Sequence, residues 1–417
     1  MNRKMTLILS SLIIISIVVV LFFVFNRSAG GPVRNVDTGL TYDTIQAALD
    51  ANETLDGHTI SVRGGVYNES IALNKAIVLI GEDDNPTIID GRRANYGINV
   101  NGKSVTIKGF TIRNCTNGIN LKGSNNSLIT ENNISLTTNA ILVYNSVNLT
   151  IHQNTVGNNN RAGILVTNSQ NFTISNNMVF DNGLSVQLGY GINTNFSANG
   201  LIKRNIAYGN WYDGIGLLDS SNCTVIENTV ENNRINGVLL SASSGSFVYY
   251  NNIINNSVQA VDFDLTNKWD DGVEGNYWSN YAGVDSNYDG IGDTAQATTG
   301  GNQDTKPLMG MFHSFTASTG HQVNIVSNST VTDFAFFAAN NTIRIYVANA
   351  SVLQSFGFCR LAIPKALIAT PYTVTIDDGS APVLNLNDTL YDNSTHRWIY
   401  FAYAQSTHKI DIVGTPP

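Results

Sequence analysis

The chain has 417 residues, of which 31 are Asp or Glu and 23 are Lys or Arg, so its formal net charge is -8 at pH 7. This length accommodates two or three domains, and the mild negative charge argues against a nucleic-acid partner, which requires a basic face. The three cysteines are widely spaced and form no CxxC motif, so the sequence contains no evident disulfide framework or zinc site.

The amino terminus carries an uncharged segment over residues 6–25 that is rich in Leu, Ile, Val and Phe. As a helix this segment would span about 30 Å, the thickness of the hydrocarbon core of a bilayer. Because Arg3 and Lys4 precede it, we expect residues 1–5 to stay in the cytoplasm and the rest of the chain to lie outside. The sequence predicts a single-pass anchor followed by a linker over residues 26–35; a cleaved signal peptide is the alternative.

The part of the chain after the anchor has the composition of an exported β-protein. Its polar residues are mainly Asn, Ser and Thr, and only 13% of the whole chain is charged. Asn-x-Ser/Thr sequons are frequent, for example at Asn148, Asn171 and Asn222, and these are potential glycan acceptors on an exported protein.

A short helix is expected soon after the linker. Ile45, Ala48 and Leu49 fall on one face of an amphipathic helix. Asp43 or Thr44 would cap its first turn. Such a helix suits the open end of a stacked β-structure, because it covers unpaired strand edges and apolar side chains.

One short sequence motif, a small residue followed by alternating apolar positions, recurs from Gly97 to about residue 260. Its copies open at Gly97, Gly118, Ala140, Gly163, Gly191, Gly214, Gly237 and Ala260. A second marker, apolar-x-x-Asn-x-apolar, keeps step at Asn132, Asn154, Asn177, Asn205, Asn228 and Asn251. Two markers in step define a repeat.

Each copy holds two or three short runs of alternating apolar residues and no helical pattern. Such a unit cannot bury its apolar face alone and must stack on its neighbours. One copy per turn predicts an all-β, parallel β-helix over residues 36–280, with coils about 4.8 Å apart. The repeated asparagines are expected to form a structural ladder at an inward bend, where Asn tolerates the left-handed backbone and its amide reaches the next coil.

One corner of this solenoid is a candidate binding site. The copy that opens at Gly163 is about five residues longer than its neighbours, and an insertion must bulge outward at a turn, where solenoids build sites. Beside it stand Tyr190, Trp211, Tyr212 and Asp213. Aromatic rings pack on the apolar faces of sugars while polar groups bond the hydroxyls. We take these four residues as a candidate glycan-binding site; the alternative is that the rings only cover the bulge.

Acidic residues gather where the repeat ends. Asp262 and Asp264 share one strand face, and Asp270 and Asp271 follow closely. Paired carboxylates are typical of glycoside hydrolysis. Because the coil is ending there, we expect solvated capping charges instead and assign no catalytic residue.

Three features together resemble a known family. Besides the coils, these are Tyr-Asp-Thr-Ile-Gln-Ala-Ala-Leu at 42–49 and Gly-Asn-Tyr-Trp-Ser at 275–279. Over roughly residues 36–310 the chain is similar to right-handed parallel β-helix proteins of the NosD type. The resemblance implies a right-handed, pectin-lyase-like solenoid. It leaves function open, because the family includes surface adhesins, carbohydrate-binding proteins, sugar-active enzymes and a copper-protein maturation factor.

Residues 281–310 contain a calcium-loop pattern, Asp-Ser-Asn-Tyr-Asp-Gly-Ile-Gly-Asp at 285–293. The expected ligands are Asp285, Asn287, Asp289, the Ile291 carbonyl and Asp293, with Asp304 as the nearest acid to complete the shell. This spacing is that of loops that wrap Ca2+, although Gln at position 12 and the missing flanking helices exclude an EF-hand. We expect a structural Ca2+ that stiffens the junction after the solenoid; a plain Asx-rich turn is the alternative.

The remaining residues, 311–417, show seven short apolar runs at irregular spacing. They lie at 323–326, 334–337, 342–347, 358–363, 372–376, 398–403 and 408–412. So many short strands in about a hundred residues predict a small antiparallel, Ig-like β-sandwich.

Two functions from different classes follow. The first is a membrane-anchored cell-surface protein that binds polysaccharide or cell-envelope glycan without catalysis. The second is a polysaccharide hydrolase, lyase or epimerase on the same β-helix. The motifs Asn-Thr-Asp, Gly-His-Gly and Arg-Ile-Lys of polygalacturonase-like enzymes are absent from the sequence, which favours the first. His, Met and Cys, which copper sites group, are scattered singly, so we expect the resemblance to carry the fold and not copper handling.

Overall fold

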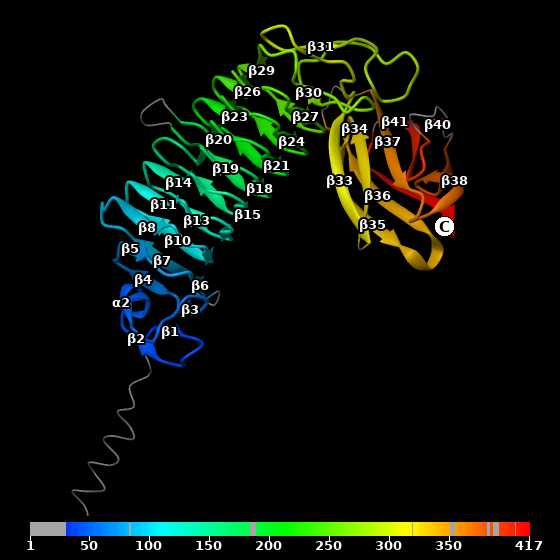
Figure 1. The fold of residues 1–417 in the computed structure, drawn as a ribbon. Coiled ribbons are helices and arrows are strands. Elements are labelled where there is room, and N and C mark those ends of the chain that lie inside the picture. Colours follow the sequence, from blue (N-terminus) through cyan, green and yellow to red (C-terminus); the bar gives the residue numbers. More distant parts are fainter. Residues whose placement is uncertain are drawn as a thin grey trace, which may run out of the picture.

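The computed structural model describes residues 31–82, 85–183, 189–318, 320–350, 355–381, 384–386, 392–404 and 406–417. The expected membrane anchor at 6–25 lies outside these residues. Over the described ranges, no helix combines the length and the apolar character needed to cross a bilayer. The chain forms a long solenoid followed by a β-sandwich at its carboxyl-terminal end (Figure 1).

Three sheets form the walls of the solenoid, and each coil adds one strand to each sheet in the order A, B, C (Figure 1). Sheet A holds β1 (Val33–Asn35), β2 (Thr41–Tyr42), β3 (Thr59–Val62), β6 (Val78–Gly81), β9 (Thr106–Lys108), β12 (Leu128–Thr130), β15 (Thr150–His152), β18 (Thr173–Ser175), β21 (Leu201–Lys203), β24 (Thr224–Ile226) and β27 (Phe247–Tyr249). Apart from β1 and β2, which pair antiparallel at its start, its strands are parallel. β1 lies where a linker was expected.

The other two walls have the same parallel pairing. Sheet B holds β4 (Gly65–Tyr67), β7 (Thr87–Asp90), β10 (Phe110–Arg113), β13 (Asn133–Ile134), β16 (Thr155–Gly157), β19 (Met178–Phe180), β22 (Ile206–Tyr208), β25 (Thr229–Glu231), β28 (Asn252–Ile254) and β30 (Tyr277–Trp278). Sheet C holds β5 (Ile71–Leu73), β8 (Tyr96–Asn101), β11 (Asn117–Lys122), β14 (Asn139–Tyr144), β17 (Ile164–Thr167), β20 (Ile192–Asn195), β23 (Asp213–Leu218), β26 (Asn236–Ser241) and β29 (Val258–Asp262). The predicted parallel β-helix is confirmed.

Aliphatic side chains stacked in register fill the solenoid. In sheet A the fully buried stack includes Ile107, Ile129, Ile151, Ile174 and Ile202. Because side chains alternate along a strand, the residues on either side of each isoleucine point outward. Each buried isoleucine contributes about 1.5–3 kcal/mol relative to an exposed one, so the repeat itself supplies the core.

A helix closes the amino-terminal end of the solenoid, as predicted. It is α2 (Ile45–Asp50), with Ile45, Ala48 and Leu49 on its buried face. Thr44 is the cap residue, and its side chain accepts a hydrogen bond from the Ala47 N–H.

The expected asparagine ladder runs up the turn from sheet A to sheet B, here called the A–B turn. Each amide nitrogen from Asn132 to Asn228 donates to Oδ1 of the next ladder asparagine at 2.9–3.0 Å. We expected the ladder asparagine itself to have the left-handed backbone, and this was wrong. The left-handed residue is the one before it, for example Gln153 or Arg204. That residue reverses the chain, so that the asparagine after it points inward and the turn residue stays outside.

The sequence analysis missed a second asparagine ladder, at the turn from sheet B to sheet C, the B–C turn. It consists of Asn159, Asn182, Asn210, Asn233 and Asn256, joined by Nδ2 to Oδ1 bonds of 2.9–3.0 Å. Its residues stand five positions after those of the first ladder, a regularity that could have revealed it. Serines form a similar ladder at the turn from sheet C to sheet A, the C–A turn. There the backbone N–H of each serine donates to Oγ of the serine on the next coil at 3.0–3.2 Å.

At the carboxyl-terminal end of the solenoid, two buried carboxylates accept hydrogen bonds from the last residues of these ladders. Asp304 Oδ2 accepts from the backbone N–H of Asn276 at 2.7 Å and from Trp278 Nε1 at 2.8 Å. Asp262 Oδ2 accepts from Trp269 Nε1 at 2.8 Å. Both acids are fully buried. The expectation of a solvated charge at Asp262 was therefore wrong, and the oxygens of Asp304 serve the end of the ladder rather than the 285–293 loop.

The carboxyl-terminal domain is an antiparallel β-sandwich, as predicted, reached through the small hairpin of β31 (Gln296–Ala297) and β32 (Gln303–Asp304). Its first sheet has the order β33 (Met311–Ser318), β34 (His321–Ser327), β37 (Phe356–Pro364), β41 (His396–Ala404), β40 (Leu384–Leu386). Its second sheet has the order β35 (Thr330–Phe337), β36 (Thr342–Ala348), β42 (His408–Thr415), β38 (Ala369–Ile376), β39 (Gly379–Ser380), and a 3-10 turn, η1 (Ala338–Asn340), joins β35 to β36. All seven predicted runs lie in strands.

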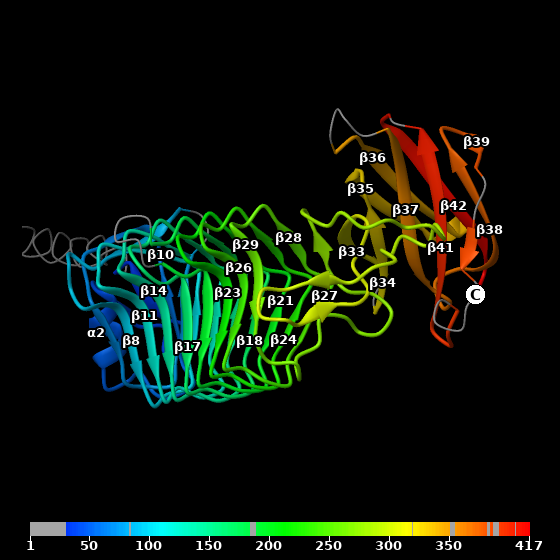
Figure 2. The same ribbon diagram turned by 90° about the horizontal axis from the view of Figure 1, so that it is seen from above.

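The sandwich packs against the last coils of the solenoid (Figure 2). A separate apolar cluster joins the two, with Tyr250 and Tyr277 from the solenoid against Phe312, Phe358 and Tyr400 of the sandwich. Tyr250 and Phe312 stack with their ring planes 6° apart and their centroids at 4.5 Å. This cluster fixes the first sheet of the sandwich against the solenoid end.

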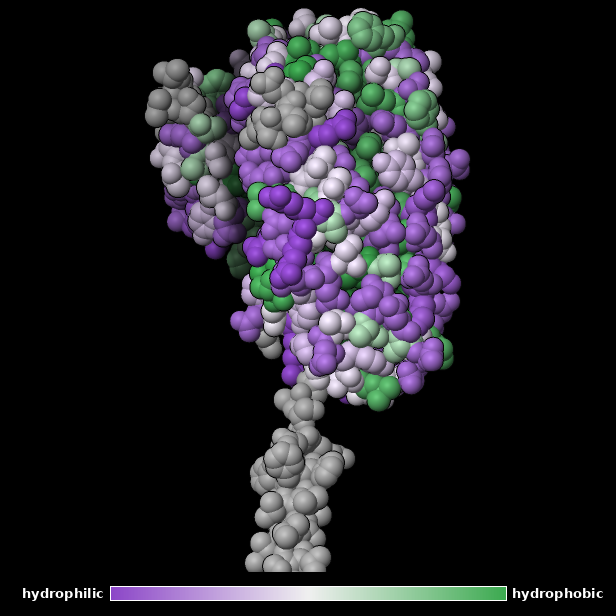
Figure 3. Space-filling view, turned by 90° about the vertical axis from the view of Figure 1, so that its left-hand side faces the viewer, coloured by the Kyte–Doolittle hydropathy of each residue, from purple (hydrophilic) through white to green (hydrophobic). Residues whose placement is uncertain are grey.

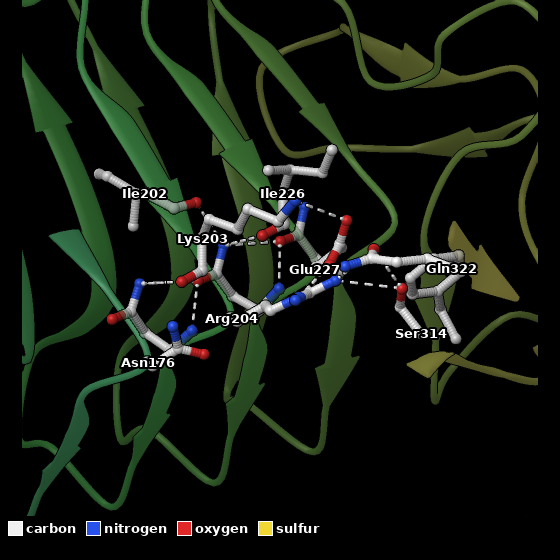
Figure 4. A network of polar contacts seen from close by, with 12 residues as sticks. Asn176, Ile202, Lys203, Arg204, Ile226, Glu227, Ser314 and Gln322 are labelled. Atoms are coloured by element: carbon white, nitrogen blue, oxygen red, sulfur yellow. Dashed lines mark hydrogen bonds and ion pairs between the residues drawn. The ribbon is translucent and has the colours of Figure 1, made fainter. Parts of the chain in front are cut away.

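Two arginines cross the same junction. Arg360, which is fully buried, donates from Nε to Glu274 Oε1 at 2.6 Å and from Nη1 to the Asp289 carbonyl at 2.6 Å. Arg204 pairs with Glu227 on the solenoid and reaches Ser314 and Gln322 of the sandwich with Nη2 (Figure 4). The junction is thus held by charge pairs as well as by apolar contact.

Candidate functional site

The four residues of the candidate glycan site lie where the B–C turns of successive coils stack into one edge of the solenoid, here called the B–C corner. Tyr190 directly precedes the strand segment opened by Gly191, and Asp213 is the first residue of β23. The Gly191 N–H donates to the Asp213 carbonyl at 2.8 Å, so Tyr190 and Asp213 sit on adjacent coils. Residues 184–188, within the longer copy, lie outside the described residues.

Three of the four residues are brought together. The rings of Tyr190 and Tyr212 meet with centroids 5.4 Å apart and planes tilted by 50°. Burial raises the pKa of the Tyr190 hydroxyl, and the neighbouring charges of Asp213 and Tyr212 raise it further. Two half-buried aromatic rings beside a carboxylate are a surface on which a sugar ring could pack.

Asp213, the acid that the sequence placed beside the rings, is not at the surface. Its side chain is fully buried, and Oδ1 accepts from Asn236 Nδ2 at 2.8 Å. Oδ2 is buried and has no hydrogen-bond partner among the residues that the structure describes. Burial raises the pKa of this carboxyl to about 6, because the charged form loses solvation that one amide cannot replace.

Trp211, the residue before Tyr212, contacts an arginine of the next coil. Its ring is covered on one side by the guanidinium of Arg234, whose Cζ stands 4.7 Å from the ring centroid. Stacking on a cation orients the indole. Sequence analysis did not connect Arg234 with this site, because the two residues are 23 positions apart and meet only through the coil repeat.

Two further polar atoms belong to the site and were also missed. Asn193 and Asn195 lie on the outer face of β20, just after Tyr190, and the Oδ1 atom of each is buried and has no hydrogen-bond partner within the described ranges. The Asn193 amide lies over Gly216 on the adjacent strand, where a side chain larger than hydrogen would press against it. Together with Asp213 Oδ2, the neighbouring strands β20 and β23 thus hold three buried acceptors that find no donor in the described part of the chain.

The 285–293 loop is ordered by its own backbone. The N–H groups of Asp289 and Gly290 donate to Asp285 at 3.0 and 2.8 Å, and the Ser286 N–H donates to Asp293 Oδ2 at 2.9 Å. Gly290 has the left-handed φ of +84° that the pattern predicted. The carboxylates therefore close Asx-type turns, and the proposed Ca2+ stays a prediction.

Comparison with known families gives one match over more than half of the chain. Residues 51–283 match the family model described as "Periplasmic copper-binding protein (NosD)". A cell surface glycoprotein of Methanothermus fervidus is 32% identical over 133 residues. That alignment takes in 32% of this chain and 21% of the relative, so it spans about a fifth of that protein.

Solved structures with similar coils include two polysaccharide-acting proteins. An alginate lyase from Paenibacillus sp. str. FPU-7 covers 53% of this chain and 91% of its own, with 15% identity and a TM-score of 0.36. The A-module of the mannuronan C-5 epimerase AlgE6 of Azotobacter vinelandii covers 54% and 74%, with 19% identity and a TM-score of 0.37.

The description of the matching family names copper, a metal held by grouped His, Met or Cys. Within the described ranges, no three His, Cys, Asp or Glu side chains gather where they could hold a metal ion. Cys115, Cys223 and Cys359 are buried and unpaired. Burial raises the pKa of Cys115 and Cys359 to about 11, whereas the metal ligand is the thiolate. These residues do not fit a resident copper ion.

Proposed function

The chain belongs to the family of periplasmic copper-binding proteins (NosD), and from this premise we propose that it is a non-catalytic surface protein that binds a polysaccharide or cell-envelope glycan. The site is the B–C corner at Tyr190, Trp211, Tyr212 and Asp213. The proposal includes a membrane anchor at residues 6–25, a cell-surface location and a structural Ca2+ at the 285–293 loop.

One observation carries the binding proposal. Buried polar atoms in proteins are nearly always paired, yet Asp213 Oδ2, Asn193 Oδ1 and Asn195 Oδ1 have no hydrogen-bond partner among the described residues, and all three stand on the neighbouring strands β20 and β23. All three are acceptors, so their natural partner is a ligand rich in hydroxyl donors. Rings at Tyr190 and Tyr212 beside them supply the apolar contact that a sugar ring needs.

A second candidate, a polysaccharide-active enzyme, is favoured by a different observation. The pKa of Asp213, raised to about 6 by burial, lies near the value that suits a general acid or base at neutral pH. Tyr190, on the adjacent coil, is a second proton-carrying group. In such an enzyme, Asp213 would exchange a proton with the bound sugar.

One experiment separates the two functions. The full chain in a mild detergent is incubated with acidic and neutral polysaccharides, and both retention and new reducing or unsaturated ends are measured. Retention without product that is lost in Trp211→Ala and Tyr212→Ala supports binding. Product that disappears in Asp213→Asn, with retention kept, supports the enzyme.

A matched control is available on the neighbouring coil. Phe196 is 62% exposed and lies on the C–A turn, away from the B–C corner. Phe196→Ala removes an exposed aromatic ring of comparable size and should change neither signal. Equal loss of retention in the control and in Trp211→Ala, or no retention of any polysaccharide, contradicts the proposed site.

A further inference from the structure

Four arginines without an acidic partner stand along the B–C corner. They are Arg92 and Arg93, Arg161, and Arg234, all exposed to solvent. Among the described residues, no guanidinium nitrogen of the four lies within 4.0 Å of a carboxylate oxygen, although the backbone N–H of Arg92 donates to Asp90 Oδ1 at 3.2 Å. Arg113, Arg204, Arg344, Arg360 and Arg397 by contrast all have one. Arg34 and Arg63, in and next to sheet A, also lack such a partner among the described residues, so four of the six described arginines without one stand along this edge of a chain whose net charge is -8.

The coil repeat sets the spacing of these arginines. Arg92 and Arg93 follow β7, Arg161 follows β16 and Arg234 follows β25. In sheet B, β7 and β16 are separated by three coils, and so are β16 and β25. At about 4.8 Å per coil, positive charge recurs roughly every 14 Å along the edge. Such a row suits an extended chain that carries repeated negative groups.

A groove lies at the first of these positions. It has a volume of about 650 Å3 and is lined by Arg92 and Arg93 together with Thr116, Thr138 and Asn160. Asp90 also borders it, but its carboxylate already accepts from Arg113 Nε at 3.1 Å and from Asn114 Nδ2 at 2.8 Å. The groove therefore presents two guanidinium groups that pair with no carboxylate in the described part of the chain, beside mostly neutral side chains.

The same edge carries the aromatic rings of the proposed glycan site. Arg161 lies near enough to Tyr190 to influence its pKa electrostatically, and Arg234 covers Trp211. Hydrophilic atoms cover most of the solenoid side that Figure 3 turns to the viewer. Charge and aromatic contact thus run along one continuous edge from the coil of Arg92 to the coil of Arg234.

We propose that the B–C corner is an elongated binding groove for an anionic polysaccharide, with a second subsite at Arg92 and Arg93. This inference rests on the proposed glycan-binding function and names its ligand class. Guanidinium groups bind carboxylate or sulfate oxygens in a bidentate manner, while Tyr190 and Tyr212 pack on sugar rings. A nucleic acid is less suited, because the chain is acidic overall and its other edges carry glutamates in ion pairs.

The test compares two double variants of the full chain. Arg92→Gln/Arg93→Gln removes the proposed subsite, and Arg34→Gln/Arg63→Gln removes two other exposed arginines that lie in sheet A and beyond its first solenoid strand. Binding is measured at low salt to polygalacturonic acid, dextran sulfate and uncharged dextran, and thermal unfolding confirms that each variant is folded. Comparing the first two ligands separates carboxylate from sulfate recognition.

The first double variant should bind at least one acidic polymer about tenfold more weakly, because two charge-assisted contacts are lost. The loss should shrink as salt rises and should be absent for uncharged dextran. The control pair should stay within about twofold of the natural chain, as expected for exposed charges away from the groove. An equal loss in both double variants, or none in either, overturns the subsite.

Other outcomes separate this inference from the function on which it rests. If Tyr212→Ala abolishes binding of all sugars and Arg92→Gln/Arg93→Gln does not, glycan binding stands and the anionic groove fails. If no polysaccharide is retained, the proposed function itself fails. If single-stranded DNA binds as tightly as the acidic sugars and is lost in the same variant, the groove is a general polyanion site and the polysaccharide proposal is overturned.

Discussion

Asparagines on the inside and on the outside of this solenoid behave in opposite ways. At the A–B turn each ladder amide bonds the coils above and below it, and no described ladder asparagine leaves a buried side-chain oxygen unpaired. On the outer face of β20, Asn193 and Asn195 each leave a buried oxygen without a partner. The difference teaches that residue type alone does not distinguish scaffold from site. An asparagine belongs to the scaffold when the next coil supplies the hydrogen-bond partners of its side chain.

The largest effect should come from breaking a buried polar pair at the junction. Arg360→Leu leaves the buried Glu274 carboxylate without its charged partner, which should lower the free energy of unfolding by about 3–5 kcal/mol. Arg344→Leu is the matched control, because it removes a solvent-screened pair with Asp411 and should cost far less. Denaturant titration measures both. Similar losses in the two variants would mean that Arg360 does not hold the junction.

The next effect tests the inner ladder. Asn205→Ala should cost about 3 kcal/mol, because Asn177 and Asn228 lose a partner and several buried amide groups stay unpaired. Asn199→Ala, at an exposed position of the same coil, should cost about 1 kcal/mol or less. Thermal or chemical unfolding compares them. Polysaccharide retention should be unchanged in both folded variants, and an Asn205→Ala protein of unaltered stability would contradict the ladder.

A smaller, pH-dependent effect is expected on the outer side, at Asp213. Its pKa is raised from 3.8 in the unfolded chain to about 6 in the folded chain, so the folded state binds the proton more tightly. The unfolding free energy therefore falls as pH rises from about 4 to about 6, by roughly 2–3 kcal/mol. Asp213→Asn should remove this fall and be more stable than the natural chain above pH 6, with no difference near pH 3. Parallel curves of unfolding free energy against pH for the two proteins would show that folding does not raise the pKa of Asp213.

The smallest effect concerns the predicted calcium site. At a Ca2+ concentration ten times the Kd, binding should raise the unfolding free energy by about 1.4 kcal/mol, which a thermal melt can resolve. Asp289→Ala should abolish the response to Ca2+ and to a chelator. A natural chain that melts identically with Ca2+ and with chelator would leave the loop as a turn ordered by Asp285, Asp293 and Arg360 alone.

Much of the architecture could be predicted because it depends on short, local sequence patterns. Alternating apolar residues repeated once per coil have only one way to bury their faces, so the sheets, the Asn154 ladder and the α2 cap followed from pattern. The second ladder at Asn159 was equally regular and was missed only because one marker had already explained the repeat. The strands of the sandwich followed from the same alternation.

The candidate site could be predicted only in part. The extra length after Gly163 and the neighbouring aromatic residues indicated the B–C corner. The sequence did not indicate that Asp213 is buried, because its burial depends on side chains from adjacent coils. Nor did it connect Arg234 with Trp211, or Arg92 with the same edge, since these contacts arise between residues that meet only when the coils are stacked.

The sequence by itself determined the period, the parallel solenoid and the order of its parts, because these depend on side-chain alternation along the chain. Only the tertiary structure decided which polar groups are satisfied. Asp262 and Asp304 became buried acceptors at the end of the ladders, while Asp213 kept an oxygen without a donor. The physical reason is that a hydrogen bond between coils requires the partner at the right height and angle, which stacking fixes and composition does not.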